Sequence, residues 1–148
     1  MPVHAQRSRM IRVEAEIPEY LMSEFQRLMA ELLAGKRPRM EALERDLAAI
    51  EGRATRALAT IVKSIEAHPT TGQAGRLVRF LAGLYNGQDY PFDLTELRGL
   101  DTALANACLD YLNYDRLGIA EVHRHLPGGG EQLHGWMRGY GLLADGRG

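Results

Sequence analysis

The stretch over residues 69–101 constrains the fold more than any other part of this chain, because it contains the start and end signals of successive helices. Thr70-x-x-Gln73 is a capping box, in which a hydroxyl residue begins a helix and a Gln or Glu three positions later supports it. Asn86-Gly87 is expected to end this helix. Asp93-x-x-Glu96 is a second box that opens the next helix. The stretch therefore predicts short helices joined by tight turns.

Helical spacing of apolar residues extends this prediction toward the N-terminus. Pro18 suits a first helical position, and Gly35 followed by Pro38 ends the helix between them. A long helix over about 39–67 has a heptad seam, which widens near its end as expected where a helix enters a globular core. The seam consists of Met40, Leu43, Leu47, Ile50, Ala54, Ala57 and Ile61, and it is widened by Leu58, Val62 and Ile65. These two helices are predicted to form an antiparallel hairpin.

The C-terminal half has the same helical character. Asp101 caps a helix that runs to about Asn113, and a final pair of helices is expected over about 119–126 and 131–140. No segment alternates apolar and polar residues in the manner of a strand. The predicted core comprises Leu77, Val78, Phe80, Leu81, Leu84, Leu104, Cys108, Leu109, Leu112 and Trp136. The predicted fold is all-α, with an N-terminal antiparallel helical hairpin packed on a small multi-helix globular domain.

This reading divides the chain into four segments. Residues 1–16 are a flexible arm, 17–67 the helical hairpin and candidate dimerisation element, 68–143 the helical domain, and 144–148 a frayed tail. A length of 148 residues suits one domain with an appendage.

Composition restricts the setting and the partners. The net charge of −1 gives no overall attraction to nucleic acid or anionic membrane. The lone Cys108 permits no intramolecular disulfide, which is typical of a reducing compartment. No apolar run reaches the ~18–20 residues of a membrane span, and the N-terminus lacks the apolar core of a secretory signal. We expect a cytoplasmic protein with no membrane contact.

Three patterns that suggest chemistry have simpler structural interpretations. His123 and His125 are two positions apart, so they do not share a helix face, and His134 belongs to another element. The Pro-Gly-Gly-Gly-Glu turn at 127–131 lacks the Lys and Ser or Thr of a phosphate loop. The carboxylates near residues 89–101 act as helix caps. We therefore predict no catalytic, metal-binding or cofactor-binding residue, no cofactor, and no enzyme.

Two sets of residues are candidates for contact with other molecules. Tyr and Arg are enriched at binding hot spots. The candidate interaction surface accordingly comprises Arg76, Arg79, Tyr85, Tyr90, Arg98 and Tyr114. The first helix has more apolar residues than one packing partner covers, so a second row is left for self-association, with a twofold dimer expected. The candidate dimer surface comprises Met22, Phe25, Leu28, Met29 and Leu33.

A long motif also resembles an uncharacterised bacterial domain family associated with proteobacterial plasmids and integrative conjugative elements. It runs from Thr71-Gly72-Gln73 through Gly83-Leu84-Tyr85-Asn86-Gly87 to the segment 92–101. The later Glu121-Val122-His123 and the segment 126–131 are similar as well, although Asn-Gly-Gly is the pattern expected after the proline. The resemblance covers about residues 54–140. It implies a cytoplasmic accessory protein of a mobile element and supplies no activity.

The sequence thus leads to a non-enzymatic interaction protein, a mobile-element accessory factor that acts by binding another protein. The alternative is a nucleic-acid-binding accessory factor, suggested by the abundance of Arg and the basic turn Lys36-Arg37-Pro38-Arg39. The near-neutral net charge opposes this alternative, because affinity for phosphate backbones comes mainly from Lys and Arg.

Overall fold

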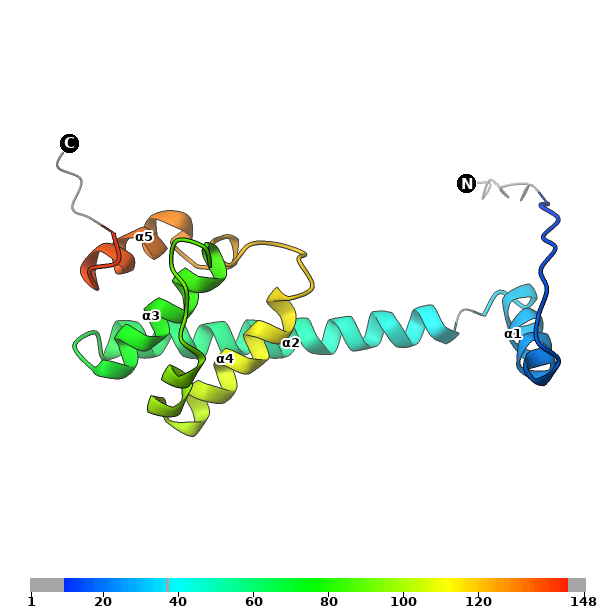
Figure 1. Ribbon diagram of the computed structural model, residues 1–148, viewed down its shortest axis with the longest axis horizontal. Helices are drawn as coiled ribbons and strands as arrows, with labels where there is room; N and C mark the ends of the chain where they lie inside the picture. Colours follow the sequence, from blue (N-terminus) through cyan, green and yellow to red (C-terminus); the bar gives the residue numbers. More distant parts are fainter. Residues whose placement is uncertain (1–9, 37, 144–148) are drawn as a thin grey trace, which may run out of the picture. The chain divides into compact units, whose positions relative to one another are not determined.

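A computed structural model describes residues 10–36 and 38–143, and within these ranges the chain forms helices and no strand (Figure 1). The predicted all-α class is therefore confirmed. Contacts divide the chain into two compact units, Met1–Ala42 and Leu43–Gly148. Residues 10–16 of the predicted arm have no regular secondary structure, whereas residues 1–9 and the predicted frayed tail 144–148 lie outside the described residues.

The first unit contains a short 3₁₀ turn, η1 (Glu19–Leu21), followed by the helix α1 (Met22–Leu33). Pro18 precedes η1 and its carbonyl accepts a hydrogen bond from the Leu21 N–H at 2.9 Å, so a 3₁₀ turn stands where the sequence predicted the first α-helical turn. Gly35 has a φ of +76°, the left-handed conformation that glycine adopts without strain. The predicted glycine stop is thus confirmed.

The long helix α2 (Pro38–Ala67) has 30 residues, which at ~1.5 Å per residue makes a rod of about 45 Å. The boundary between the units falls within it, after Ala42. Its buried residues begin at Ala54, and the helices α3, α4 and α5 gather along its C-terminal half (Figure 1). The expectation that the heptad seam enters a globular core is confirmed by the burial of Ala54, Ala57, Leu58, Ile61, Val62 and Ile65. The pairing of α1 with α2 as a hairpin stays a prediction.

The helix α3 (Gly72–Tyr85) begins as predicted, but with different capping chemistry. Thr71, rather than Thr70, caps it and accepts a hydrogen bond from the Ala74 N–H at 3.3 Å. Gln73 does not bond back to the cap. Its Oε1 instead accepts a hydrogen bond of 2.7 Å from the Asp101 N–H, 28 residues away. Gln73, the second residue of the expected capping box, therefore links the start of α3 to the start of the helix that follows Asp101.

The segment after α3 departs from the predicted helix. Asn86 ends α3 with a φ of −153°, so no left-handed residue is used there. Asp93 accepts a hydrogen bond from the Thr95 N–H at 2.8 Å, but it opens only the 3₁₀ helix η2 (Leu94–Gly99). The capping box fails because Glu96 is bound by a side chain of α3 and is not free to bond back to the cap.

Beyond η2 come α4 (Thr102–Asp115), the 3₁₀ turn η3 (Val122–Arg124) and α5 (Gly129–Gly139). Asp101 caps α4 as predicted, with a 2.8 Å hydrogen bond from the Leu104 N–H. The predicted helix over 119–126 is wrong. Only η3 forms there, and His123 and His125 beside it contact Tyr85 of α3 and Tyr114 of α4. At the far end the Tyr140 hydroxyl donates a hydrogen bond to the Pro69 carbonyl and so joins α5 to the α2–α3 turn.

The core of the second unit is contributed by α2, α3, α4, η3 and α5. Six of the ten predicted core residues are buried, namely Leu77, Val78, Phe80, Leu81, Leu104 and Cys108. Three more, Leu84, Leu112 and Trp136, are partly buried and pack against the core. The prediction that Leu109 lies in the core is wrong, because 52% of this residue is exposed. The buried face of α4 instead includes Tyr111 and Tyr114, so α4 is rotated relative to the expected apolar series.

Candidate functional site

Of the three predicted surface arginines, Arg76 and Arg79 lie at the contact between α3 and η2. Arg79 donates from Nε to both carboxylate oxygens of Glu96, at 2.9 and 3.1 Å. The Arg76 guanidinium lies beside Gly99, where an added Cβ would be only 2.5 Å from Arg76 Cζ. Arg98 is exposed on η2. Arg76 and Arg79 therefore hold η2 against α3, and the guanidinium of Arg79 is already paired.

The three predicted surface tyrosines lie in separate places. Tyr85 is half-buried near the end of α3, with the rings of His123 and His134 edge-on to it at 5.4 and 5.5 Å. Tyr90 is half-buried against the core. Tyr114 is only 5% exposed and belongs to the core. The six candidate residues thus do not form one exposed patch.

The three histidines that the sequence suggested as metal ligands, His123, His125 and His134, each contact a tyrosine ring. His123 lies on Tyr85, with its Nδ1 3.3 Å from a Glu121 carboxylate oxygen, and His125 lies edge-on to Tyr114 at 5.5 Å. Over the described ranges, no group of three or more His, Cys, Asp or Glu side chains is arranged to hold a metal ion.

The candidate dimer residues on α1 form its apolar side. No residue of α1 is buried. Met22, Phe25, Met29 and Leu33 are exposed, and Leu28 is half-buried. On α2 the first seam positions of the second unit, Leu43 and Leu47, are also exposed, Ile50 is half-buried, and the positions from Ala54 onward are buried.

A groove that the sequence did not predict lies in the second unit, between α2, α4 and the segment that leads into α5. Its volume is about 390 Å³. Its buried lining consists of the aliphatic residues Ala54, Leu58 and Val62 and the aromatic residues Tyr111 and Tyr114. We call this cavity the α2–α4 groove.

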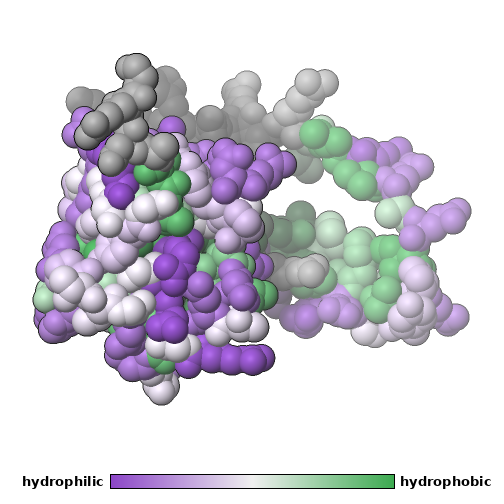
Figure 2. Space-filling model, turned by 60° about the vertical axis from the view of Figure 1, so that its left-hand side comes forward, coloured by the Kyte–Doolittle hydropathy of each residue, from purple (hydrophilic) through white to green (hydrophobic). Residues whose placement is uncertain are grey.

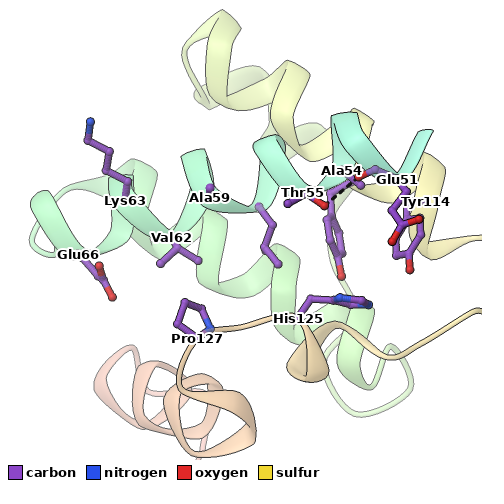
Figure 3. Close-up of a pocket in the computed structure, with 12 residues that line it drawn as sticks. Glu51, Ala54, Thr55, Ala59, Val62, Lys63, Glu66, Tyr114, His125 and Pro127 are labelled. Atoms are coloured by element: carbon purple, nitrogen blue, oxygen red, sulfur yellow. Dashed lines mark hydrogen bonds between the residues drawn. The ribbon is translucent and has the colours of Figure 1, made fainter. Parts of the chain in front are cut away.

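The two walls of the α2–α4 groove face each other in Figure 3. Thr55 and Ala59 stand on α2, and His125 and Pro127 lie on the loop opposite. The Thr55 hydroxyl is turned back onto its own helix, where it donates to the Glu51 carbonyl at 3.0 Å.

Charged residues occur only at the rim of the groove. They are Glu51, Lys63 and Glu66. Figure 3 shows the Lys63 side chain pointing away from His125 and Pro127. Glu66 accepts a hydrogen bond of 3.1 Å from the Gln132 side chain. The charges therefore lie outside the apolar interior.

Tyr114 and Tyr111 both bring a phenol group to the groove lining, and Tyr111 is the more deeply buried. The residue is 1% exposed, and its hydroxyl has no hydrogen-bond partner among the described residues. Burial raises the pKa of the Tyr111 phenol, and the nearby Asp115 and Tyr114 add to this rise. A raised pKa keeps the phenol protonated at neutral pH, so it can donate or accept a hydrogen bond but is not activated as a base. The spacing Ala107, Cys108, Tyr111, Tyr114 follows one helix face and was the signal available in the sequence.

The second unit has two further hollows, one of about 440 Å³ beside the loop between α4 and η3 and one of about 310 Å³ between α2 and the start of α4. Figure 2 shows the globular end of the second unit covered mostly by hydrophilic residues, with hydrophobic ones visible in small patches. No helix in the described part of the chain combines the length and the apolar character needed to cross a membrane.

Fold and site together define a small all-α protein with an apolar groove along its longest helix. The chain belongs to the family of unknown function DUF7673, whose model matches residues 52–141. The expected membership of an uncharacterised domain family is thereby confirmed, and the match begins within α2 and ends just after α5. No curated protein and no solved structure matches the chain.

Proposed function

We propose that this chain is a non-enzymatic accessory factor of a mobile element that acts in the cytoplasm by binding another protein. The observation that carries the proposal is the apolar surface of α1, in which Phe25 and Met29 lie on the same side of the helix and are each nearly two-fifths exposed. Exposed apolar residues gathered on one side of a helix mark an interaction surface rather than the scattered exposure of ordinary proteins.

Helix stability supports the same proposal. α1 has 12 residues and buries none of them. Isolated helices shorter than about 12–15 residues are marginal in water, and they become stable when an amphipathic face is covered. A partner that covers Met22, Phe25 and Met29 would supply this stabilisation.

The polar residues of the second unit support a non-enzymatic role because they are engaged in holding its elements together. Arg79 binds Glu96, and Gln73 binds the backbone of Asp101, which itself caps α4. The mobile-element setting is supported by the resemblance, whose motif over residues 71–101 lies inside the matched range 52–141.

The test is affinity capture from cells that naturally make the protein, with protein and nucleic acid both quantified. We expect the unmodified chain to retain a partner protein, and the Phe25→Glu/Met29→Glu double variant to lose it because charge enters the apolar face. Gln26→Glu is the matched control, since Gln26 is an exposed polar residue of the same helix, and it should capture as the unmodified chain does. Equal capture by all three proteins would contradict the proposal.

Retention on heparin or a shifted DNA band that weakens steeply with salt would instead support the nucleic-acid-binding alternative. We place this alternative second because the chain has a net charge of −1, whereas affinity for phosphate backbones comes mainly from Lys and Arg.

We further propose that the chain forms a twofold homodimer through α1 and the start of α2. Leu43 and Leu47 continue the heptad seam of α2 and are exposed, so two copies could bury these residues together with the α1 face in a four-helix bundle. Light scattering should give twice the chain mass of 16.5 kDa. Phe25→Glu or Leu28→Glu should give the monomer mass with the C-terminal helices intact, and a monomer mass for the unmodified chain at all concentrations would refute the dimer.

A further inference from the structure

A buried hydroxyl in the α2–α4 groove lacks a partner. Tyr111 is 1% exposed, and its Oη makes no hydrogen bond to any described residue. Buried tyrosine hydroxyls usually find a partner, because an unsatisfied buried polar group costs free energy. Since Tyr111 lines the groove, a molecule seated there can supply the missing partner once the side chains that cover Oη move aside.

The size and lining of the groove suit a small molecule. Its volume of about 390 Å³ falls within the roughly 300–1,000 Å³ typical of ligand pockets. Its buried lining is apolar apart from the phenol groups of Tyr111 and Tyr114, and pockets of this class combine apolar walls with a few polar groups that orient the ligand. A protein partner would need a much broader surface, since a stable interface takes roughly 800 Å² from each side.

The charge distribution favours a neutral ligand. The rim residues Glu51 and Glu66 are exposed, and the ammonium of Lys63 is directed away from the opposite wall. His125, the other titratable residue of the wall, is also exposed. Among the described residues no acidic or basic side chain is therefore buried in the groove interior, and a charged group placed there would lose its hydration without compensation. We propose that the α2–α4 groove binds a neutral, largely apolar small molecule carrying one hydroxyl, carbonyl or amide group that hydrogen-bonds to Tyr111 Oη.

The experiment compares two probes of almost equal shape, 2-naphthol and naphthalene, by following amide shifts of the full chain in a two-dimensional NMR titration. We expect both to bind at one site that includes the groove residues, with 2-naphthol on the order of fivefold tighter because it makes the additional hydrogen bond. In Tyr111→Phe this preference should disappear while naphthalene binds as before. Tyr111→Phe removes an unpartnered hydroxyl, so the helices should remain intact.

A second variant tests the position of the site independently. Ala59 is exposed on the α2 wall, and Ala59→Trp should fill the groove and abolish binding of both probes. Ala49→Trp, at an exposed position of the same helix that does not line the groove, should bind as the unmodified chain does.

Three results would overturn the inference: no saturable binding of either probe, an unchanged preference for 2-naphthol in Tyr111→Phe, or full binding by Ala59→Trp. Loss of a captured partner protein in Ala59→Trp, without any binding of 2-naphthol, would show that the groove is a protein-binding surface and would also overturn it.

Discussion

Cys108 and Tyr111 lie three positions apart on the buried face of α4, and each has a titratable group removed from water. Burial raises the pKa of the Cys108 thiol to about 12. Burial, together with Asp115 and Tyr114, raises the pKa of the Tyr111 phenol. Because of their positions, both groups therefore stay neutral in the folded protein at pH values at which they ionise in the unfolded chain.

The first prediction concerns the reactivity of Cys108. Because the thiolate is the reactive form and the side chain is fully buried, a disulfide reagent such as Ellman's should not label the folded chain at pH 8. One thiol per chain should react at once in denaturant. Rapid labelling under native conditions would contradict the predicted inertness.

The second prediction concerns alkaline pH. In the unfolded chain Cys and Tyr ionise near their ordinary pKa values, about 8.5 and 10. The folded state retains protons that the unfolded state releases, so the free energy of unfolding should be unaffected below about pH 8 and should fall as the pH rises above this value. Urea unfolding between pH 7 and 10.5 measures this fall, which should be shallower in Cys108→Ala. An equal slope in the two proteins would show that the thiol is not involved.

At the scale of elements, close contacts at helix starts and crossings hold α3, η2 and α4 together. Asp101 caps α4 with its side chain, and its own N–H is bound by Gln73 of α3. Gly83 of α3 lies against the next segment, where an added Cβ would be 3.0 Å from the Phe92 Cβ and 3.2 Å from the Tyr90 carbonyl oxygen.

Loss of the α4 cap gives the third prediction. Asp101→Ala should lower the free energy of unfolding by about 1 kcal/mol, the usual cost of replacing an Asp cap. Asp101→Asn keeps a side-chain oxygen for the Leu104 N–H, so it should lose much less. Chemical denaturation of both variants measures the difference, and equal losses would indicate that the carboxylate acts through charge rather than through the cap.

A pair of glycines gives the fourth prediction. Gly83→Ala forces a Cβ against neighbouring backbone and should destabilise the chain by on the order of 1 kcal/mol. Gly135 of α5 has open space around it, so Gly135→Ala should stabilise by about 0.5–1 kcal/mol through helix propensity alone. The midpoint of thermal unfolding should therefore fall for Gly83→Ala and rise for Gly135→Ala. A stabilising effect of Gly83→Ala would mean that the segment containing Phe92 moves to make room for the added methyl group.

At the scale of the whole molecule, the two units differ in how much each buries. Every buried hydrophobic residue of the described ranges, from Ala54 to Met137, belongs to the second unit. Its core joins four helices and the η3 turn, and Tyr140 connects α5 to the α2–α3 turn.

The fifth prediction follows from this location of the core. A fragment comprising residues 43–148 should fold cooperatively on its own, with nearly the urea midpoint of the full chain. A peptide of residues 1–42 should be largely unfolded, because α1 alone is too short to be stable in water. Circular dichroism of both fragments measures this, and loss of cooperativity in the longer fragment would show that the first unit completes the core.

Much of the fold could be predicted because helix signals are local. The Asp101 cap, the Gly35 stop and the entry of the α2 seam into the core all rest on residues within a few positions of one another. These interactions act within one or two helical turns, so the order of residues alone is enough to predict them.

What only the tertiary structure decided was the use of residues whose partners are distant in the sequence. Gln73 and Glu96 suited local caps, yet they bind Asp101 and Arg79 across 28 and 17 residues. Leu109 suited the core and is exposed, while Tyr111 is buried, because the rotation of α4 depends on the surfaces that α2 and α3 present. The groove was unpredictable for the same reason. Helical spacing determines which residues share a face, whereas burial and cavities depend on which surfaces the other helices bring against that face.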